Sequence, residues 1–455
     1  MPEAATRVAP AMPACDHEPR PYAGPSRDEV LADRRRYVNP AVFTLYAEPI
    51  MIVEGWMQWL FDETGRRYLD MIAGIVTVSC GHAHPKITRA VAEQVETLQH
   101  ATTIYLHPNL PLLAKKLASK MPAGLDVTYF VNSGSEANDL AITMARLHTG
   151  NTDVVALRNA YHGTSPAALG LTSHSTWKYP VPQNTRVHHA LCPDPYRNPF
   201  AGSPEEIARR SAEDIRELIR YSTPGQIAAF IAEPIQGVGG ATLGPPNYLA
   251  EAFAVVREHG GLCVADEVQT GFGRTGEYYW GFQNFGVTPD IVTMAKGLGN
   301  GAPIAAVTTT AEIASALTQR IHFNTYGGNP VSMAAGLAVL DAIDEDGLQE
   351  NCRVLGARLK SGLEVLATRH SLIGDVRGLG LMLGVELVRD RATKEPAKRA
   401  TAEVLEYTRE RGVLIGKGGF HGNVLRIKPP MCITADDVDF TLAVLDDAFA
   451  AAGNG

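Results

Sequence analysis

The sequence predicts an α/β protein with a large domain, built on a mostly parallel sheet flanked by helices, and a smaller α+β domain. From about Val127, short apolar runs alternate with amphipathic segments, which is the pattern of parallel strands joined by helices. Past about Pro330 the pattern changes to long helices with short strand candidates between them. The chain has 455 residues, 45% of them apolar, which is enough for two or three compact units.

Apolar runs mark the strands of the large domain. We expect strands at residues 127–131, 153–157, 227–232, 262–265, 291–295 and 304–309. A helix is expected over residues 135–148, where Gly150 closes it. Another is expected over residues 247–261, with Gly260 and Gly261 as a stop signal. This alternation predicts crossover connections within one sheet.

The second unit is expected to contain long helices at residues 330–346, 349–369 and 398–411 and strands at 380–388, 412–415 and 423–427. Near the beginning, residues 58–72 form a probable hairpin around Glu63-Thr64-Gly65, too short for a core of its own. We therefore expect four segments: a flexible tail (1–20), an N-terminal segment packing with the small domain (21–75), a large cofactor-binding domain (76–330) and a C-terminal small domain (331–455).

Composition favours small-molecule chemistry. The net charge of −8, from 41 Lys and Arg against 49 Asp and Glu, gives no basic surface for nucleic acid or membrane lipid. Six scattered cysteines without a CxxC pair indicate a reducing compartment. No run approaches the roughly 20 apolar residues that span a bilayer, and Glu3, Asp16 and Glu18 interrupt what an acid-poor transit peptide would need. The expectation is a cytoplasmic protein that binds neither nucleic acid nor membrane.

Two patterns are interpreted as carrying no cofactor or metal chemistry. Residues 271–276 spell GxGxxG, but "EYYWGFQNFG" follows instead of an apolar helix, and Asp290 begins the next strand instead of ending it. Both features count against a nicotinamide dinucleotide site. The histidines of "GHAHP" (81–85) and His188-His189 have no third ligand at a recognisable spacing and are interpreted as loop residues, so no metal site is expected.

Polar residues follow three predicted strands at the edge where open parallel sheets bind ligands. Asn132-Ser133-Gly134-Ser135 lies between a strand and a helix, where backbone amides and two hydroxyls can hold a phosphate. Asp266 ends the next such strand, and Lys296 follows "IVTMA". A phosphate cradle, a buried carboxylate and an enclosed lysine are together what pyridoxal phosphate (PLP) requires. The three positions therefore predict a PLP site.

The same residues belong to motifs that resemble the class III aminotransferases, which have the fold type I arrangement of a large PLP domain and a small domain. These motifs run in family order from about Pro21 to the last helix: "NSGSEAND", "AYHG", "AEPIQG", "ADEVQTGFGRTG", "MAKGLGNG", "NTYGGNP" and "VRGLGLMLGVEL". Within the class, "YLDMIAGIVTVSCGHAHPKI" and "GVLIGKGGFHGNVLRIKPPMCIT" look most like the alanine–glyoxylate aminotransferases that also accept 3-aminoisobutyrate with pyruvate.

The resemblance implies roles for individual residues around the cofactor. Lys296 matches the lysine that binds PLP covalently, and Asp266 matches the acid on its pyridine nitrogen. The residues that match the remaining cofactor contacts are Ser133, Gly134 and Ser135 at the phosphate, Tyr161 and His162 of "AYHG" with Val268 at the ring, and Gln269 at the phenolic oxygen.

Three further residues have roles implied by the resemblance. Thr325 matches a threonine that reaches the phosphate of the neighbouring subunit, which implies a homodimer (or a dimer of dimers) with shared sites. Arg426 matches the arginine that binds a substrate carboxylate, a task suited to a planar bidentate donor. Glu233 matches an acid that in some members pairs with this arginine.

The function implied is transfer of an amino group from alanine, a β- or ω-amino acid or an amine to a keto acid such as glyoxylate or pyruvate. Related phospho-lyases, which act on ethanolamine phosphate, share "NTYGGNPVS" and remain an alternative. A nicotinamide oxidoreductase would require the GxGxxG segment to bind dinucleotide. A non-catalytic relative would be expected to lack Lys296 or Asp266, and this chain has both.

Overall fold

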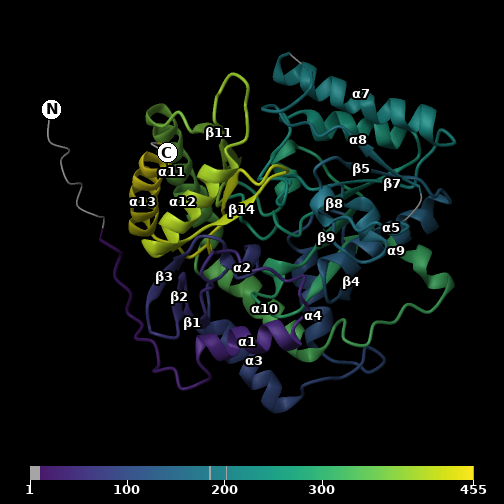
Figure 1. Ribbon diagram of the computed structural model, residues 1–455. Coiled ribbons are helices and arrows are strands. Elements are labelled where there is room, and N and C mark those ends of the chain that lie inside the picture. The colour runs from purple at the N-terminus through teal and green to yellow at the C-terminus, as the bar shows by residue number, and fades with distance from the viewer. Residues whose placement is uncertain (1–10, 184–185, 201, 454–455) are drawn as a thin grey trace.

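The computed structural model describes residues 11–183, 186–200 and 202–453 (Figure 1). A seven-stranded sheet forms the centre of the large unit. Its strands, in spatial order, are β4 (Val127–Val131), β10 (Ala305–Thr309), β9 (Ile291–Met294), β8 (Leu262–Asp266), β7 (Ala229–Ala232), β5 (Val154–Leu157) and β6 (Val187–Ala190). Strands β9, β8, β7, β5 and β6 pair in parallel, which confirms the expected α/β class.

Strand β10 is antiparallel to both of its neighbours, β4 and β9, so the sheet is mostly parallel, as expected, with one reversed strand. Only residues 295–304 separate β9 from β10. A parallel return needs a crossover of a dozen or more residues, so this short connection can only reverse the chain. The consequence for the site is that the beginning of β10 lies at the same edge as the ends of the other strands.

The interpretation of His188 and His189 as loop residues was also wrong, because both lie in strand β6. Val187 and Ala190 flank them, and His188 pairs with Val155 of β5. The His188 Nε2 lies 2.7 Å from Asp153 Oδ1, and burial lowers the pKa of His189 to about 4. Within the described ranges, no group of three or more His, Cys, Asp or Glu side chains gathers in a way that could hold a metal ion.

Helices cover both faces of this sheet. Helix α5 (Gly134–Thr149) packs over the face that carries Val154 and Ala156, while α7 (Pro204–Ser222) and α8 (Tyr248–Glu258) pack over the opposite face with Val155 and Leu157. This division follows from the two-residue alternation of side chains along a strand. The remaining helices of this half are α1 (Arg27–Tyr37), α2 (Ala73–Val76), α3 (Pro85–Thr97), α4 (Asn109–Ala118), α6 (Ala168–Leu171) and α9 (Ala311–Ser315).

Two four-stranded sheets lie in the other half of the molecule. One has the order β1 (Ile52–Trp56), β2 (Trp59–Asp62), β3 (Arg67–Asp70) and β13 (Val413–Leu414). The other has the order β11 (Ile373–Leu379), β12 (Met382–Leu387), β15 (Val424–Ile427) and β14 (Gly416–Gly418). Helices α11 (Leu348–Arg369) and α12 (Lys398–Glu410) pack with these sheets, α13 (Ala435–Gly453) packs against α11 and α12, and α10 (Pro330–Glu345) packs against α3, α4 and α11.

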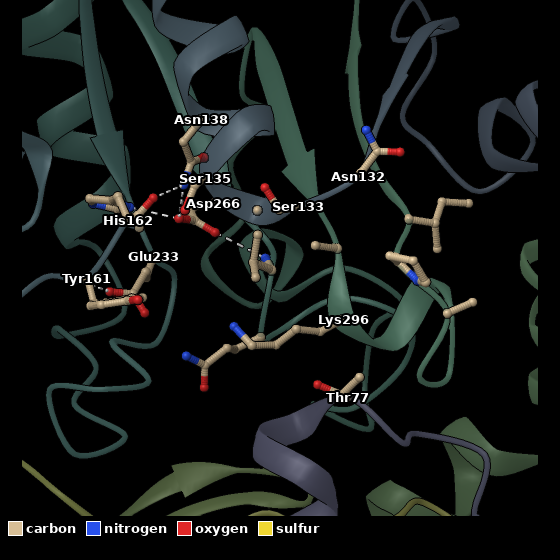
Figure 2. A pocket seen from close by; sticks show the side chains of 18 of the residues that line it. Thr77, Asn132, Ser133, Ser135, Asn138, Tyr161, His162, Glu233, Asp266 and Lys296 are labelled. Carbon is tan, nitrogen blue, oxygen red and sulfur yellow. Dashed lines mark hydrogen bonds and ion pairs between the residues drawn. The ribbon is translucent and has the colours of Figure 1, made fainter. Parts of the chain in front are cut away.

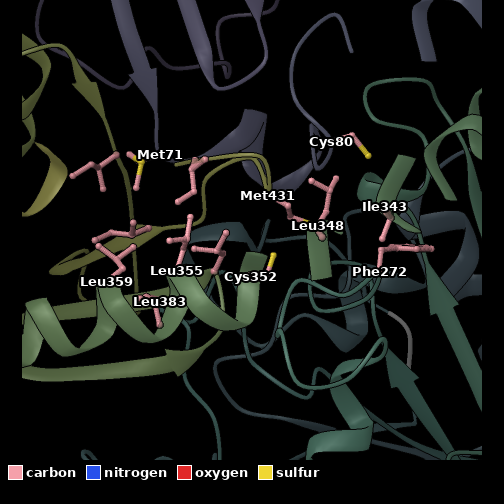
Figure 3. Close-up of a cluster of buried hydrophobic side chains, with 14 of the residues drawn as sticks. Met71, Cys80, Phe272, Ile343, Leu348, Cys352, Leu355, Leu359, Leu383 and Met431 are labelled. Carbon is pink, nitrogen blue, oxygen red and sulfur yellow. The ribbon is translucent and has the colours of Figure 1, made fainter. Parts of the chain in front are cut away.

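The N-terminal hairpin pairs with the C-terminal part of the chain, since β3 and β13 form a parallel ladder. One hydrophobic cluster is continuous across the proposed domain boundaries: Figure 3 shows Met71, Phe272, Leu348 and Leu383 contributing to it. The boundaries at 75/76 and 330/331 remain predictions.

The proposed flexible tail falls partly outside the described residues, at positions 1–10. Residues from the 11–20 segment contact the first small sheet, and the flexibility of this tail stays a prediction. His17 Nε2 is 2.7 Å from Glu54 Oε1, and its ring stacks on Trp56 with the centroids 5.0 Å apart. Across the part of the chain that the structure describes, no helix has the length and apolar character needed to cross a membrane.

The glycines of the GxGxxG segment are packing positions. Gly276 has φ +84°, and a Cβ there would lie 2.6 Å from the Cα of Arg353 in α11. A Cβ on Gly271 would lie 2.9 Å from the ring of Trp280. Contact with a helix and an indole, at a turn without a following apolar helix, is not the geometry of a dinucleotide loop.

Candidate active site

A cavity of about 310 Å³ opens at the carboxyl edge of the central sheet. Every residue predicted for the site lines this cavity except Thr325 and Arg426. The lining residues among them are Ser133, Gly134, Ser135, Tyr161, His162, Glu233, Asp266, Val268, Gln269 and Lys296. They come from the ends of five different strands, so the sheet itself brings together residues that are far apart in the sequence.

Lys296 is the first residue of a short 3-10 helix (Lys296–Leu298) and extends into the middle of the cavity (Figure 2). Its backbone has φ +42°, in the left-handed region that is costly for a residue with a side chain. Burial lowers the pKa of its amine; Asp266 and Glu233 oppose this shift, and Arg426 adds to it. No hydrogen bond to this amine exists among the described residues, which leaves it available to a ligand.

Asp266 lies on the far side of the cavity and is held by three donors. Its Oδ2 is 2.7 Å from Nδ1 of His162 and 2.8 Å from Nδ2 of Asn138, and its Oδ1 accepts from the amide of Val268 at 3.1 Å. Thr293 in turn donates to Asn138 Oδ1 at 2.7 Å. The carboxylate is 3% exposed, so its position and direction are fixed by this network (Figure 2).

The start of helix α5 forms the third side of the cavity. Ser133 is the N-cap residue, and its hydroxyl accepts from the amide of Glu136 at 3.2 Å. The amides of Gly134 and Ser135 belong to the first turn, whose N–H groups have no partner within the helix. Gly163 approaches so closely that a Cβ there would lie 2.3 Å from the Ser135 hydroxyl oxygen. Free amides at a helix N-terminus favour an anion.

Among the described residues no hydrogen bond or ion pair joins Glu233 to Arg426, and the pairing that the resemblance implies stays a prediction. Glu233 Oε1 accepts from the amide of Tyr161 at 3.0 Å, and Glu233 Oε2 accepts from the amide of Gly237 at 2.8 Å. Both oxygens are engaged because β7 ends beside two loops whose amides face it. Burial raises the pKa of Glu233. The Tyr161 ring meets Trp177 edge-on, with the centroids 5.1 Å apart.

The two residues outside the lining have different surroundings. Arg426 lies on β15, its Nε is buried without a partner, and burial lowers its pKa to about 10 while Glu233 opposes that shift. It is thus an enclosed cation within electrostatic range of Lys296. Thr325 is exposed in the segment between residues 319 and 330, and this chain does not bring it to its own cavity.

Some lining residues had not been singled out from the sequence. Asn138 lies one turn after the phosphate-loop motif, a spacing that puts it on the same face of α5 as Gly134 and Ser135. Residues 301–304 reach the cavity because β10 runs antiparallel. Thr77 enters from the segment after α2, and nothing in the local sequence marks it. Helical spacing could have indicated Asn138 from the sequence, whereas residues 301–304 and Thr77 reach the cavity only through the topology of the fold.

The residues present fit PLP. The open α5 amides suit its phosphate, the unpartnered Lys296 amine suits its aldehyde carbon, and the fixed Asp266 carboxylate suits its ring nitrogen. Gly134 leaves room at the loop, since a Cβ there would approach the Val268 methyls to 3.2 Å. A two-part α/β fold with this lysine and acid at the edge of the sheet defines a PLP-dependent enzyme.

The family model described as aminotransferase class-III matches residues 45–449, and the chain belongs to this family. It is 53% identical over 435 residues to the mitochondrial alanine–glyoxylate aminotransferase 2 homolog 2 of Arabidopsis thaliana, covering 96% of this chain and 90% of that protein. It is 44% identical over 459 residues to the mitochondrial alanine–glyoxylate aminotransferase 2 of Homo sapiens, covering 96% and 89%.

Solved structures agree with this assignment. An (S)-enantioselective ω-transaminase from Thermomicrobium roseum has a TM-score of 0.88 at 34% identity, covering 95% of this chain and 100% of that one. A phospholyase from Arthrobacter in complex with phosphoethanolamine has a TM-score of 0.87 at 35% identity, covering 93% and 99%. The predicted class III aminotransferase fold and PLP-dependent transaminase activity are confirmed.

The cytoplasmic location expected from the sequence is contradicted by these comparisons, because the relatives from Arabidopsis and human are mitochondrial proteins. The acidic residues near the start of the chain were given too much weight, since an acid-poor segment is a tendency of transit peptides and not a requirement.

Proposed function

We propose that this protein transfers an amino group from alanine, a β- or ω-amino acid or an amine to glyoxylate or pyruvate, with PLP held in the cavity at the edge of the sheet. The observation that carries the proposal is the convergence of Lys296, Asp266 and the start of α5 on one cavity. The identity of 53% to an alanine–glyoxylate aminotransferase homologue supports this choice of donor and acceptor.

Bound PLP supplies an electron-withdrawing ring that stabilises negative charge at the substrate carbon next to nitrogen. Lys296 would hold the cofactor through its amine. The same amine, whose pKa burial lowers, would carry the proton from that substrate carbon to the carbon that was the cofactor's aldehyde. The Asp266 carboxylate keeps a proton on the ring nitrogen. His162 and Asn138 prevent the carboxylate from turning away.

The other proposed contacts hold the cofactor in position and take no part in proton transfer. The amides of Gly134 and Ser135 and the Ser133 hydroxyl hold the phosphate at the helix N-terminus. Val268 and Tyr161, which line the cavity, would contact the two faces of the ring. The Gln269 amide reaches the ring oxygen. These contacts fix the ring relative to Lys296, which is what controls the protonation step.

Arg426 is proposed to bind the carboxylate of the donor and of the keto acid in turn. Its buried guanidinium has an unpartnered Nε and carries a pKa lowered to about 10, so an incoming carboxylate offsets a desolvation cost that the protein leaves uncompensated. The amides of Tyr161 and Gly237 hold the Glu233 carboxyl in place, so its charge would act on Arg426 from a fixed position.

A homodimer with shared sites is proposed from the surface around Thr325. Large apolar side chains are exposed in three segments of the described chain. These are Tyr37, Val38, Val42, Phe43 and Leu45; Ile104, Tyr105 and Leu106; and Ile321, Phe323 and Tyr326. Exposed apolar side chains grouped in this way are typical of a protein interface. Thr325 lies within the last segment, so a partner subunit covering it could receive its hydroxyl.

A second candidate function is elimination of phosphate from ethanolamine phosphate. The Arthrobacter phospholyase favours it, with a TM-score of 0.87 at 35% identity. That identity is below the 53% and 44% found for the alanine–glyoxylate aminotransferases. Release of inorganic phosphate from phosphoethanolamine without a keto acid would identify this activity.

The function is tested by a matrix of amino donors against pyruvate and glyoxylate, with Lys296→Ala as the inactive control. We expect transfer from alanine or a β- or ω-amino acid to glyoxylate or pyruvate, and loss of both activity and the visible cofactor band in the control. Full transfer by Lys296→Ala would contradict the central assignment. Phosphate release without any amino transfer would select the second candidate.

A further inference from the structure

Lys428 is a fully buried cation next to the site that the proposed mechanism does not use. It follows strand β15, two residues after Arg426, and is 0% exposed. Its amine donates to the carbonyl oxygen of Gly237 at 3.1 Å and to Oε1 of Gln269 at 3.0 Å. Among the described residues it forms no ion pair, and it does not line the cavity.

The surroundings make this amine costly to bury. The titratable groups that face Lys428 are the basic side chains of Arg426, Lys296 and Arg274, with Glu233 as the one acid, and burial lowers the pKa of Lys428 well below the ordinary value. An apolar side chain of similar length would fill the same space without removing an amine from water. The two hydrogen bonds are therefore the feature that distinguishes lysine from methionine at this position.

Those hydrogen bonds determine which way the Gln269 amide faces. A carboxamide has one acceptor oxygen and one donor nitrogen of nearly the same size. Its hydrogen-bond partners therefore decide which of the two atoms faces each side. The Lys428 amine donates both to the Gly237 carbonyl and to Gln269 Oε1, so it pairs with the oxygen of the Gln269 amide. Since Gln269 also lines the cavity, its Nε2 is left as the donor to a ligand.

Gly237 joins the same network from the other side. Its amide donates to Glu233 Oε2 at 2.8 Å, while its carbonyl accepts from Lys428. A Cβ at Gly237 would lie 2.2 Å from Gln269 Oε1, so the bare backbone packs directly against the amide. Lys428 thus connects the loop after β7 with the turn after β8, and both are fixed relative to the cavity.

We propose that Lys428 is a positioning residue that orients the Gln269 amide so that its Nε2 donates to the ring oxygen of PLP. The proposal rests on the PLP site of the proposed function. A donor stabilises the anionic form of that oxygen and eases loss of a proton held nearby on the cofactor. Without Lys428 the amide can rotate, and its oxygen can face the ring oxygen instead.

The test uses the holoenzyme and follows its visible absorption band as a function of pH. We expect Lys428→Met to raise the pH midpoint of the absorption change by about one unit and to weaken PLP binding about tenfold. Gln269→Ala should raise the midpoint similarly. The double variant should match Gln269→Ala, since Lys428 acts through that side chain.

Two further variants separate positioning from general damage. Lys360→Met removes an amine that donates to the carbonyl of Gly378 at 3.2 Å, away from the cavity, and should leave the midpoint unchanged. Lys428→Gln keeps an N–H donor, so its midpoint should lie between those of the wild type and Lys428→Met. It replaces Lys428→Met if that variant does not fold. Thermal unfolding of each cofactor-free variant reports on folding.

The outcomes distinguish the inference from the function on which it rests. If Gln269→Ala shifts the midpoint and the Lys428 variants leave it at the wild-type value, the positioning role is wrong. A Lys428→Met shift that adds in full to that of Gln269→Ala would also overturn it. If Gln269→Ala itself has no effect, Gln269 does not contact the cofactor, and its assignment in the proposed function fails together with the role of Lys428.

Discussion

Lys296 combines two unfavourable features at one residue, a left-handed backbone and a buried amine. Such strain persists only where the surrounding structure determines it, and it concentrates at functional sites. Here the strand β9, the 3-10 helix after it and the cavity wall together fix the side chain. The result is a buried amine with a lowered pKa, and a lowered pKa favours the neutral form that a nucleophile and proton carrier needs.

The lowered pKa of Lys296 predicts how cofactor capture depends on pH. The neutral amine is the reactive form, so the rate at which PLP develops its visible band on cofactor-free protein should rise with pH, with a midpoint below 10.5. Glu233 raises this pKa, so Glu233→Gln should move the midpoint further down. Stopped-flow absorbance measures both, and an upward shift in Glu233→Gln would contradict the electrostatic account.

Asp266→Asn should keep the shape of the site and lose its charge. We expect kcat/KM to fall by about 10²- to 10³-fold, because an amide cannot stabilise a protonated ring nitrogen as a carboxylate does. The amide nitrogen would also face the N–H groups of His162 or Asn138. Steady-state kinetics measure the fall in kcat/KM, and the exposed Asp126→Asn serves as the control. An unchanged kcat/KM in Asp266→Asn would show that Asp266 has no part in the mechanism.

At the residue scale, site residues could be predicted from the sequence where a charged side chain directly follows a strand-forming run. Asp266 and Lys296 each follow an apolar run, so a charged group after a buried strand could be recognised from the local sequence. Asn138 and Lys428 act through partners on other elements. Their roles depend on distances such as the 3.0 Å from Lys428 to Gln269, which no local pattern contains.

At the scale of elements, Glu267 fixes the segment after β8. Its carboxyl oxygens accept from the Thr270 hydroxyl at 2.7 Å, the Gly281 amide at 2.8 Å and the Phe282 amide at 2.7 Å. It is buried, and burial raises its pKa to about 7. One side chain thus caps the start of the 3-10 helix at Gly281–Phe285 and holds it beneath the turn that carries Gln269.

Glu267→Gln should lower the free energy of unfolding by about 1–3 kcal/mol, since its amide nitrogen would face a donor. The folded carboxyl keeps its proton to about pH 7 and the unfolded one loses it near 4.5. Stability from this group therefore falls as pH rises between those values, and the variant should lack that fall. Urea unfolding at pH 5 and 7 tests this, with exposed Glu364→Gln as control; an equal slope in both proteins would contradict it.

Helices and strands with long apolar runs were predicted from the sequence. The direction of a strand, and a strand with polar residues at its centre, were not. The strand at 305–309 was expected, but its antiparallel direction follows from the short connection after Met294. Strand β6 was missed because its centre is His188-His189, two residues that a hydrophobic pattern excludes. Tertiary partners, Asp153 among them, compensate for that polarity.

At the scale of the whole molecule, shared sites predict complementation between two chains that each have a defective PLP site. A Lys296→Ala chain and a Thr325→Ala chain, refolded together, should form mixed dimers in which one site has Lys296 from one chain and Thr325 from the other. We expect that site to bind PLP with wild-type affinity, while Thr325→Ala homodimers bind about tenfold more weakly. Absorbance titration of the mixture with PLP measures these affinities. If the mixture has no site of wild-type affinity, Thr325 acts within its own chain.

The pairing of β3 with β13 has a consequence for how this chain folds. Leu69 lies opposite Val413, so the ladder joins residues that emerge far apart during synthesis. Such non-local contacts raise the contact order and slow folding, because a long loop must close before the contact stabilises anything. The hairpin made early must remain unpaired along β3 until the last part of the chain is made. That exposed edge is the place where we expect a nascent chain to depend on chaperones.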